Sequence, residues 1–356
     1  MIYEKKITTF IKLGNFLSYF VNDKNNKANK EKYLLEFYSK FEELIKTSFH
    51  YNGWFTEENV RTAISSIAQN LSKEKLEKWL KKYPENTLNK NEAKRIAVIL
   101  AGNIPMVGFH DLLCVLATGN VFIGKLSSQD NKLLPFISEI LFKLEPEFIN
   151  KIHFTENKLE NFDKIIATGS DNTSRYFEYY FGKYPHIIRK HRNSIAVLSG
   201  NETTDELEKL ADDIFLYFGL GCRNVSKIFI PENFDFEKFF ETMKKYIYLS
   251  KHNKYQNNYD YYKAIYLINK NDFKDNGFMM LTENSSFSSP ISVVYYEKYD
   301  DIKNVSKKIE TNKNKIQCIV SNFTEIGNKV DFGKTQFPEL WYYADDIDTI
   351  EFLVSR

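Results

Sequence analysis

Cysteine is scarce in this sequence, with three among 356 residues. Cys114, Cys222 and Cys318 are too few for a disulfide framework, and they lack the paired short spacing of a zinc site. The scarcity indicates a reducing compartment and gives no reason to expect a bound metal.

Long hydrophobic runs are absent as well. The N-terminal stretch, residues 2–21, is interrupted by Glu4, Lys5, Lys6 and Lys12, so it is neither a signal peptide nor a membrane-spanning helix. We therefore expect a cytoplasmic protein without a membrane span.

An excess of one charge is also missing. The 49 Lys and Arg residues nearly balance 47 Asp and Glu residues, the net charge is +2, and the two signs are interleaved along the chain. Nucleic-acid binding needs a concentrated basic surface, so nucleic acid is not an expected partner. What the chain does have is length and 43% hydrophobic residues, enough for a sizeable core and two domains.

The hydrophobic pattern changes near Arg95. Before it, apolar residues recur every three or four positions in residues 31–48 and 56–83, which predicts a mostly helical region. After it, short β-branched runs alternate with helical stretches, and this predicts parallel strands joined by right-handed crossovers. We expect strands at residues 96–100, 121–126, 152–154, 164–168, 228–230, 265–268, 291–296 and 316–320, two more within 187–199, and helices from Pro105, at 133–144, at 204–217 and from Phe236.

Polar residues follow two of these strands. Gly169 and Ser170 stand between a strand and a helix, where backbone N–H groups favour an anion, although a capping residue explains them equally well. Lys125 ends another strand and precedes Ser127 and Ser128. Ligands of open α/β sheets lie beyond such strand ends, so Lys125 is either a contact for a nucleotide ribose or phosphate or an ordinary surface lysine.

Asn103 follows a third strand, in the turn Ala101-Gly102-Asn103-Ile104-Pro105. Asparagine is a common turn-former, but its amide could instead donate to an oxyanion, as catalysis through a thioester requires. Both interpretations stay open.

Cys222 is the leading candidate for catalysis. It lies in Gly219-Leu220-Gly221-Cys222-Arg223-Asn224-Val225-Ser226, between a helical run and a short β-rich stretch. A reactive thiol needs access and an electropositive neighbour, and Arg223 either supplies that charge or pairs with a carboxylate elsewhere. Cys114 and Cys318 lie in apolar runs typical of core residues.

These candidates fall largely within the strings AGNIPMVGFHD, GSDNTSRYFEYYFGKYPHIIRKHRNS and DIFLYFGLGCRNVSK. The strings resemble those of acyl-CoA reductases related to the fatty-acid reductase of bacterial bioluminescence, within the aldehyde dehydrogenase superfamily. The likeness is strong over residues 96–231 and touches 332–353. The expected fold is α/β and aldehyde dehydrogenase-like, with a helical N-terminal region and a Rossmann-type dinucleotide-binding domain in residues 1–200, an α/β catalytic domain in 201–330 and a C-terminal segment in 331–356.

By this resemblance, Cys222 attacks an activated acyl group, carried by coenzyme A or a protein, and a nicotinamide reduces the thioester to the aldehyde. The Asn103 amide and the backbone N–H of Cys222 would hold the oxyanion. Hydrolytic relatives carry a water-activating Glu in a Glu-Leu-Gly-Gly run, but the matching residues 188–194 contain no carboxylate, which favours reduction over hydrolysis. His191 is the local group able to act as acid or base, or else a structural histidine.

The resemblance also implies the cofactor. Relatives often carry Lys-Pro-Ser-Glu, whose Lys and Glu bind the adenosine ribose, whereas this chain has Lys125-Leu126-Ser127-Ser128. Without that Glu, a 2′-phosphate meets a lysine and hydroxyls, so we expect NADPH rather than NADH. Ser170, beside Gly169, would contact the pyrophosphate.

Two other classes of function stay open: a cysteine acyltransferase or thioesterase that binds no dinucleotide, and an inactive scaffold that keeps the fold for partner binding. The sequence does not reveal the acyl chain length or whether a partner enzyme hands over acyl groups. A homo-oligomer is expected from the resemblance alone.

Overall fold

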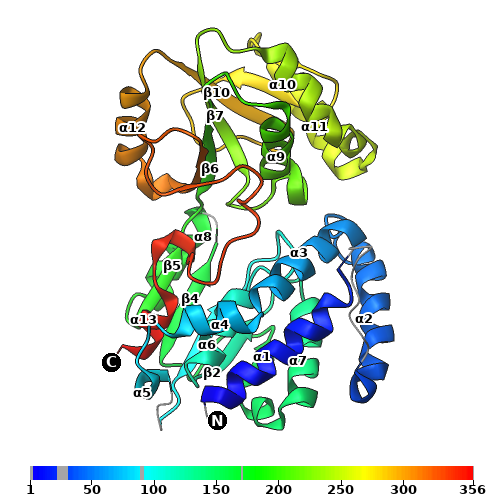
Figure 1. Cartoon of the computed structure of the whole chain (residues 1–356), viewed down its shortest axis with the longest axis vertical. Coiled ribbons are helices and arrows are strands. Elements are labelled where there is room, and N and C mark those ends of the chain that lie inside the picture. The colour runs from blue at the N-terminus through cyan, green and yellow to red at the C-terminus, as the bar shows by residue number, and fades with distance from the viewer. Residues whose placement is uncertain (1–2, 22–30, 89–91, 170, 356) are drawn as a thin grey trace. The chain divides into compact units, whose positions relative to one another are not determined.

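The computed structural model describes residues 3–21, 31–88, 92–169 and 171–355. It divides into two compact units, one formed by Met1–Lys190 with Glu339–Arg356 and the other by His191–Pro338 (Figure 1). Each unit has its own sheet. The units change at residues 190 and 338, whereas the expected domain limits were residues 200 and 330. The first limit differs because β6 (Asn193–Val197) pairs into the second sheet, and the C-terminal end of the chain packs into the first unit.

The first unit contains a five-stranded sheet in the order β3-β2-β1-β4-β5, with every neighbouring pair parallel. From β1 the chain adds β2 and β3 on one side, and it then crosses to add β4 and β5 on the other side of β1. Ligands of such sheets bind at the carboxyl ends of the strands near this switch point. The predicted strands are confirmed at β1 (Arg95–Ile99), β2 (Val121–Lys125), β3 (Ile152–Thr155), β4 (Lys164–Thr168) and β5 (His186–Arg189).

Three helices connect these strands: α6 (Phe109–Ala117), α7 (Leu133–Leu144) and α8 (Asp171–Phe181). The prediction that Pro105 starts a helix is wrong, because α6 begins at Phe109 with Gly108 as its N-cap. The preceding segment forms a loop in which Met106 has a positive φ of 56° and its N–H donates to the buried carboxylate of Asp130. Gly119 (φ 75°) follows the end of α6 in the left-handed conformation that favours glycine.

The N-terminal region is helical, as predicted, and Figure 1 shows its helices in blue and cyan. Phe10, Phe16 and Phe41 are fully buried within it. A buried lysine, Lys6, donates to carbonyls at the C-terminal ends of α5 and α6 (2.7 and 2.8 Å), and burial lowers its pKa to about 8. The helices are α1 (Tyr3–Ser18), α2 (Leu35–Thr47), α3 (Glu57–Asn70), α4 (Lys73–Leu80) and α5 (Glu85–Leu88).

The C-terminal helix α13 (Thr349–Val354), red in Figure 1, packs beside α6 in the first unit. Lys164, buried on β4, donates to the carbonyls of Phe352 (2.6 Å) and Ser355 (2.9 Å) at the end of this helix. A cation is favourable at a helix C-terminus. These contacts explain why the end of the chain joins the first unit instead of forming a separate segment.

The second unit contains a seven-stranded sheet in the order β12-β11-β6-β7-β10-β9-β8, parallel except for the pair β8–β9. Ile195, Val197 and Phe229 of its central strands are fully buried and pack in one cluster with Val305 and Ile309 of α12. Besides β6, its elements are β7 (Val225–Pro231), β8 (Lys274–Asp275), β9 (Met280–Glu283), β10 (Val293–Tyr299), β11 (Ile316–Ser321), β12 (Lys329–Val330), α9 (Thr204–Phe215), α10 (Phe236–Met243), α11 (Asn253–Ile268) and α12 (Ile302–Thr311).

The strand predicted at residues 265–268 is wrong, because these residues form the last turn of α11. A short apolar run fits a strand or a helix end equally well. Here tertiary packing decides, since Tyr259 and Tyr266 of the helix pack against Met280 of β9 and Val293 of β10.

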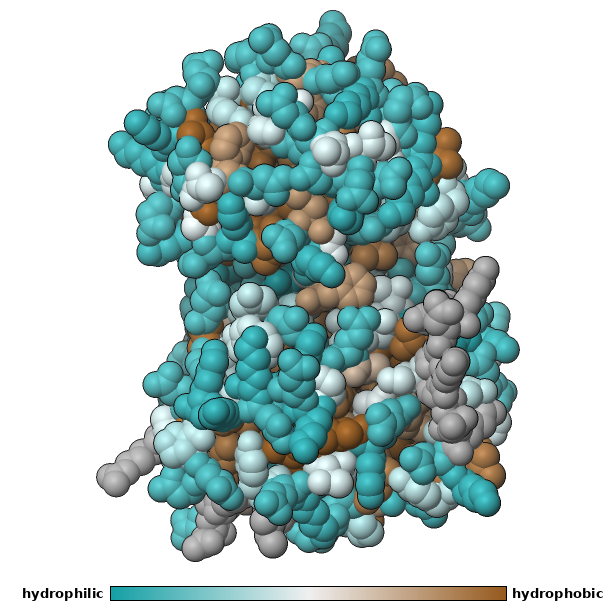
Figure 2. All heavy atoms as spheres, viewed as in Figure 1, coloured by the Kyte–Doolittle hydropathy of each residue, from teal (hydrophilic) through white to brown (hydrophobic). Residues whose placement is uncertain are grey.

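Hydrophilic side chains cover most of the molecular face seen in Figure 2. Within the residues that the structure describes, no helix combines the length and apolar content needed to cross a bilayer.

Candidate active site

Three of the predicted site residues lie at the carboxyl edge of the first sheet. Lys125 is the last residue of β2, Gly169 directly follows β4, and Asn103 lies in the loop after β1. β1 pairs with both neighbours, so Ile99 near its end is opposite Lys125 on one side and Ala167 on the other. The structure therefore brings the three loops to one edge, at the switch point of the sheet.

Glycines let these loops approach closely. A Cβ atom at Gly102 would lie 2.5 Å from Oγ of Ser127, and one at Gly169 would lie 2.9 Å from the ring of Phe177. Oγ of Ser127 accepts the backbone N–H of Gln129 in the same loop (3.2 Å). The neighbouring Ser128 is exposed. A side chain at Gly102 would push the loops after β1 and β2 apart, and one at Gly169 would push the end of β4 away from α8.

The loop that carries Asn103 is held from two sides. Buried Asp130 accepts the N–H of Met106 (2.8 Å), and burial raises the pKa of this carboxyl to about 6. The side-chain amide of Asn52, from the helical N-terminal region, donates to one carbonyl in the loop after β1 and one in the loop after β2 (3.4 Å each). Residues distant in the sequence thus fix this edge.

A pocket of about 360 Å³ lies at the same edge. Ser170, the predicted pyrophosphate contact, lies outside the described residues, and α8 begins directly after it. Tyr176 and Tyr180, one helical turn apart on α8, supply aromatic walls, and Lys125 and Glu156 supply charges of opposite sign. Flat rings beside charged groups suit a heteroaromatic ligand that carries an anion. The two tyrosines were not predicted as site residues. Their spacing of four residues, directly after the glycine turn, does indicate that they share one face of a helix.

In the second unit, Cys222 occupies a β-turn directly before β7. The turn runs from Gly221 to Asn224, whose N–H donates to the Gly221 carbonyl (3.0 Å), and Cys222 and Arg223 fill the two central positions. The Cys222 side chain is exposed, whereas the other two cysteines are buried, as predicted. This placement suits a nucleophile better than a core residue.

Asn224 anchors the turn to the preceding helix. Its buried side chain accepts the N–H of Gly221 (2.8 Å) and donates towards the carbonyls of Asp213 (3.2 Å), Ile214 (3.3 Å) and Leu216 (2.9 Å), at the end of α9. The last carbonyls of a helix have no intrahelical partner. One amide therefore satisfies the helix end and the Cys222 turn together.

Between α9 and the turn, the backbone is left-handed at three consecutive residues: Tyr217 (φ 54°), Phe218 (φ 59°) and Gly219 (φ 75°). For a residue other than glycine this conformation costs about 1–2 kcal/mol. Both aromatic side chains are buried, and the ring of Phe218 lies 4.3 Å from that of His252. Packing thus stabilises a strained segment, as is common beside functional sites.

Ser194 and Arg223 tie the turn to its neighbours. Fully buried Ser194, on β6, donates to the carbonyl of Cys222 (3.1 Å) and accepts the N–H of Cys318 (3.2 Å). Nε of Arg223 donates to the carbonyl of Thr335 (2.5 Å), a backbone contact that neither expectation for Arg223 included.

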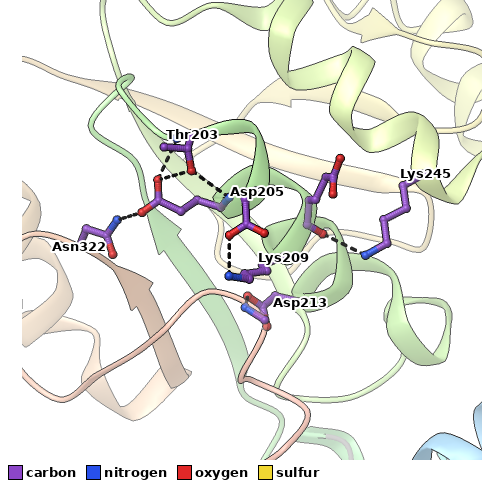
Figure 3. Close-up of polar contacts among 9 residues, drawn as sticks. Thr203, Asp205, Lys209, Asp213, Lys245 and Asn322 are labelled. Atoms are coloured by element: carbon purple, nitrogen blue, oxygen red, sulfur yellow. Dashed lines mark hydrogen bonds and ion pairs between the residues drawn. The ribbon is translucent and has the colours of Figure 1, made fainter. Parts of the chain in front are cut away.

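Asp213 of α9, labelled in Figure 3, accepts hydrogen bonds from the segment that contains Thr335. Its carboxylate accepts the N–H of Gly333 (2.7 Å) and both the N–H (3.0 Å) and the hydroxyl (2.7 Å) of Thr335. Burial raises the pKa of Asp213 to about 6. A capping box between Thr203 and Glu206, also drawn in Figure 3, fixes the start of the helix. Asp213 was not predicted, although an acidic residue on the buried face of an amphipathic helix is a signal for such a role.

Residues 188–194 have a structural part and an exposed part. Arg189 is buried in a bidentate ion pair with Asp111 (2.7 and 2.8 Å). His191 is exposed, and its Nε2 lies 3.4 Å from Oγ of Ser288. Arg189 is therefore explained by packing, while His191 stays available to solvent.

This fold is α/β and aldehyde dehydrogenase-like. Aldehyde dehydrogenase 21 from Physcomitrella patens, solved with the product succinate, is similar with a TM-score of 0.63 and 13% identity over 99% of this chain and 87% of that one. Succinic semialdehyde dehydrogenase from Streptococcus pyogenes, solved with NADP+ as the cofactor, has a TM-score of 0.61 and 12% identity over 93% and 83%. At such identities the likeness shows the fold alone. No curated protein sequence shows significant similarity.

The family described as acyl-CoA reductase (LuxC) matches residues 15–324 of the chain. The chain therefore belongs to this acyl-CoA reductase family, and the resemblance expected from its short strings is confirmed. It is an aldehyde-forming oxidoreductase that acts on fatty-acyl groups.

Proposed function

We propose that the protein reduces a fatty-acyl thioester to the aldehyde with NADPH, through a covalent acyl-enzyme on Cys222. The observation that carries the proposal is the exposed thiol at the tip of a turn that buried polar contacts hold in place. In this proposal the first unit binds the dinucleotide and the second carries the nucleophile.

The first step transfers the acyl group. The sulfur of Cys222 attacks the thioester carbonyl carbon, the bond from that carbon to the sulfur of the donor breaks, and the donor leaves as a thiol with the proton that Cys222 gives up. The contacts of Ser194 with the Cys222 carbonyl and of Asn224 with Gly221 keep the backbone of the turn fixed during the attack.

The second step consumes a hydride, which NADPH supplies when bound, and a proton from solvent. The aldehyde departs and the Cys222 thiol is regenerated. Because residues 188–194 provide no carboxylate to activate water, we propose that the acyl-enzyme survives until it is reduced.

The carboxyl edge of the first sheet suits the adenosine end of the cofactor. Its pocket has aromatic walls for an adenine ring, Gly102 allows the loops after β1 and β2 to approach closely, and Gly169 allows the close approach of α8. Among the described residues, Lys125 has no ion-pair partner within 4 Å, so its ammonium is available to a 2′-phosphate. These features support the choice of NADPH.

Intact-protein mass spectrometry after incubation with short, medium and long acyl-CoAs, without reductant, tests the acyl-enzyme. We expect one added acyl mass that disappears on addition of NADPH, with release of the aldehyde. A protein that never gains acyl mass would overturn the proposal.

A cysteine acyltransferase or thioesterase that binds no dinucleotide is the competing function, since it would also be acylated. It would leave the nicotinamide absorbance unchanged when acyl-CoA is added. The proposed reductase consumes NADPH in proportion to the aldehyde formed.

A further inference from the structure

We infer that Glu156 sets how strongly the enzyme discriminates between a 2′-phosphate and a 2′-hydroxyl on the adenosine ribose. The inference rests on the proposed function, because it assumes that the pocket at the carboxyl edge of the first sheet holds the adenosine end of the cofactor. Glu156 lines that pocket together with Lys125. The glutamate of the Lys-Pro-Ser-Glu motif is replaced by Ser128, so Glu156 supplies a carboxylate from a different loop.

The sheet places Glu156 beside Lys125. In the parallel pair β2–β3, Lys125 is opposite Thr155, the last residue of β3, and Glu156 is the next residue along the chain. Both side chains therefore leave adjacent strands at the same end of the sheet. Both contribute to the wall of the pocket.

These two charges do not neutralise one another. Within the described part of the chain, neither Lys125 nor Glu156 has an ion-pair partner within 4 Å. The nearby Lys158, which also lines the pocket, does lie 3.8 Å from a carboxylate, that of exposed Glu160. The pocket thus offers an anion-attracting and an anion-repelling group, both available to a ligand.

The chemistry of the ribose decides which group dominates. A ribose with a free 2′-hydroxyl can donate a hydrogen bond to the Glu156 carboxylate. A 2′-phosphate carries a charge of about −1.5 to −2, accepts but hardly donates, and is repelled by the same carboxylate while Lys125 attracts it. Glu156 therefore limits the preference for NADPH that Lys125 creates.

Binding of adenosine fragments to the full-length protein tests this without the reaction. The probes are 2′,5′-ADP and 5′-AMP, measured by isothermal titration calorimetry at one fixed salt concentration. For Glu156→Gln we expect the affinity for 2′,5′-ADP to rise by about tenfold and the affinity for 5′-AMP to fall by roughly threefold. The matched control is Glu178→Gln on α8, which removes the same charge from a residue that does not line the pocket. It should leave the ratio of the two affinities unchanged.

The outcomes separate the inference from the proposed function. If the wild-type protein binds both fragments and Glu156→Gln leaves their affinity ratio within twofold, or changes it only as Glu178→Gln does, the role of Glu156 is overturned and the adenosine pocket stands. If the wild-type protein binds neither fragment, both the pocket assignment and the inference fail.

Discussion

The two sheets present their candidate residues at opposite ends of their strands. In the first unit, Asn103, Lys125 and Gly169 lie at the carboxyl ends of three parallel strands. In the second unit, Cys222 precedes β7 and therefore lies at the amino end. The first arrangement follows the general rule for ligand sites in open α/β sheets, and the second does not. The candidate binding edge thus follows from topology alone, whereas the candidate nucleophile depends on a turn that its own side-chain contacts hold in place.

The two edges nevertheless share one device. Each has a buried aspartate that accepts backbone hydrogen bonds from a separate loop. Asp130 in the first unit accepts the N–H of Met106, and Asp213 in the second accepts the N–H groups of Gly333 and Thr335. Burial raises the pKa of each to about 6. In both units a loop near the candidate site is therefore fixed by a carboxyl from another segment.

The largest effect is expected at the second edge. Cys222→Ala removes the proposed nucleophile, so acyl labelling should vanish and reduction of acyl-CoA should fall by about a thousandfold or more. Intact-protein mass spectrometry and the nicotinamide absorbance measure the two quantities.

The buried cysteines are the controls for this change. Cys114→Ala and Cys318→Ala should keep one acyl label per chain, although both remove buried atoms and should lower the unfolding temperature. Labelling that survives in Cys222→Ala and disappears in either control would move the nucleophile to a buried position and remove the contrast between the edges.

The next largest effect distinguishes the contribution of the turn from that of the Cys222 thiol. Asn224→Ala leaves several carbonyls and one N–H without their shared partner, so we expect a loss of about 2–4 kcal/mol in unfolding free energy. Among molecules that stay folded, the rate of acyl labelling should drop by about tenfold or more, because the turn is no longer fixed. Chemical denaturation and a labelling time course measure these effects.

Asn201→Ala, an exposed asparagine of the same unit, is the matched control for this change and should alter neither quantity. Normal labelling by a destabilised Asn224→Ala protein would mean that the turn forms without its anchor.

Local pattern was enough to predict most of the fold. The strands of the first sheet are short, β-branched and buried, so their positions emerged from composition, and the loops after them emerged from the rule about strand ends. The failures have local causes too. Residues 265–268 are apolar whether they end a helix or form a strand, and Pro105 is followed by a loop that a distant carboxylate, Asp130, stabilises.

The candidate site was predictable in part. Cys222 stands out because glycines and an arginine surround it, whereas Asn224, two residues later, shows its role only through contacts with the end of α9. Glu156 belongs to no motif and joins the pocket because β3 lies beside β2. Contacts between distant segments leave no local pattern, so the residues that hold the site escaped prediction.

At the first edge we expect a smaller effect. Lys125→Met should weaken NADPH binding by about tenfold and NADH binding by roughly threefold or less, since the lysine interacts most strongly with the additional phosphate. Fluorescence titration of the reduced cofactors measures both. Acyl labelling of Cys222 should be unchanged, which keeps the roles of the two units distinct.

Lys143→Met, at an exposed lysine of α7, controls for the loss of one positive charge. An equal loss of affinity for NADPH and NADH in Lys125→Met would show that the lysine does not distinguish the 2′-position.

The smallest effect compares the two buried aspartates through pH. Their folded-state pKa is about 6 against an ordinary value of 3.8, so between these values the unfolded chain releases a proton that the folded chain keeps. Each carboxyl therefore contributes stability that is present below pH 3.8 and is lost as the pH rises through about 6, on the order of 2–3 kcal/mol per site.

Asp130→Asn and Asp213→Asn remove this pH dependence of stability. The unfolding temperature of each variant minus that of wild type should rise by about 2–4 °C between pH 5 and pH 7. This holds whether the variant is more or less stable than wild type at pH 5. Differential scanning fluorimetry across this range measures the shift, with exposed Asp300→Asn as the control that should follow the wild-type curve. The sites lie in different units, so the double variant should show the sum. A variant curve parallel to wild type would mean that this aspartate is already ionised at pH 5, and the similarity between the two edges would then fail at that site.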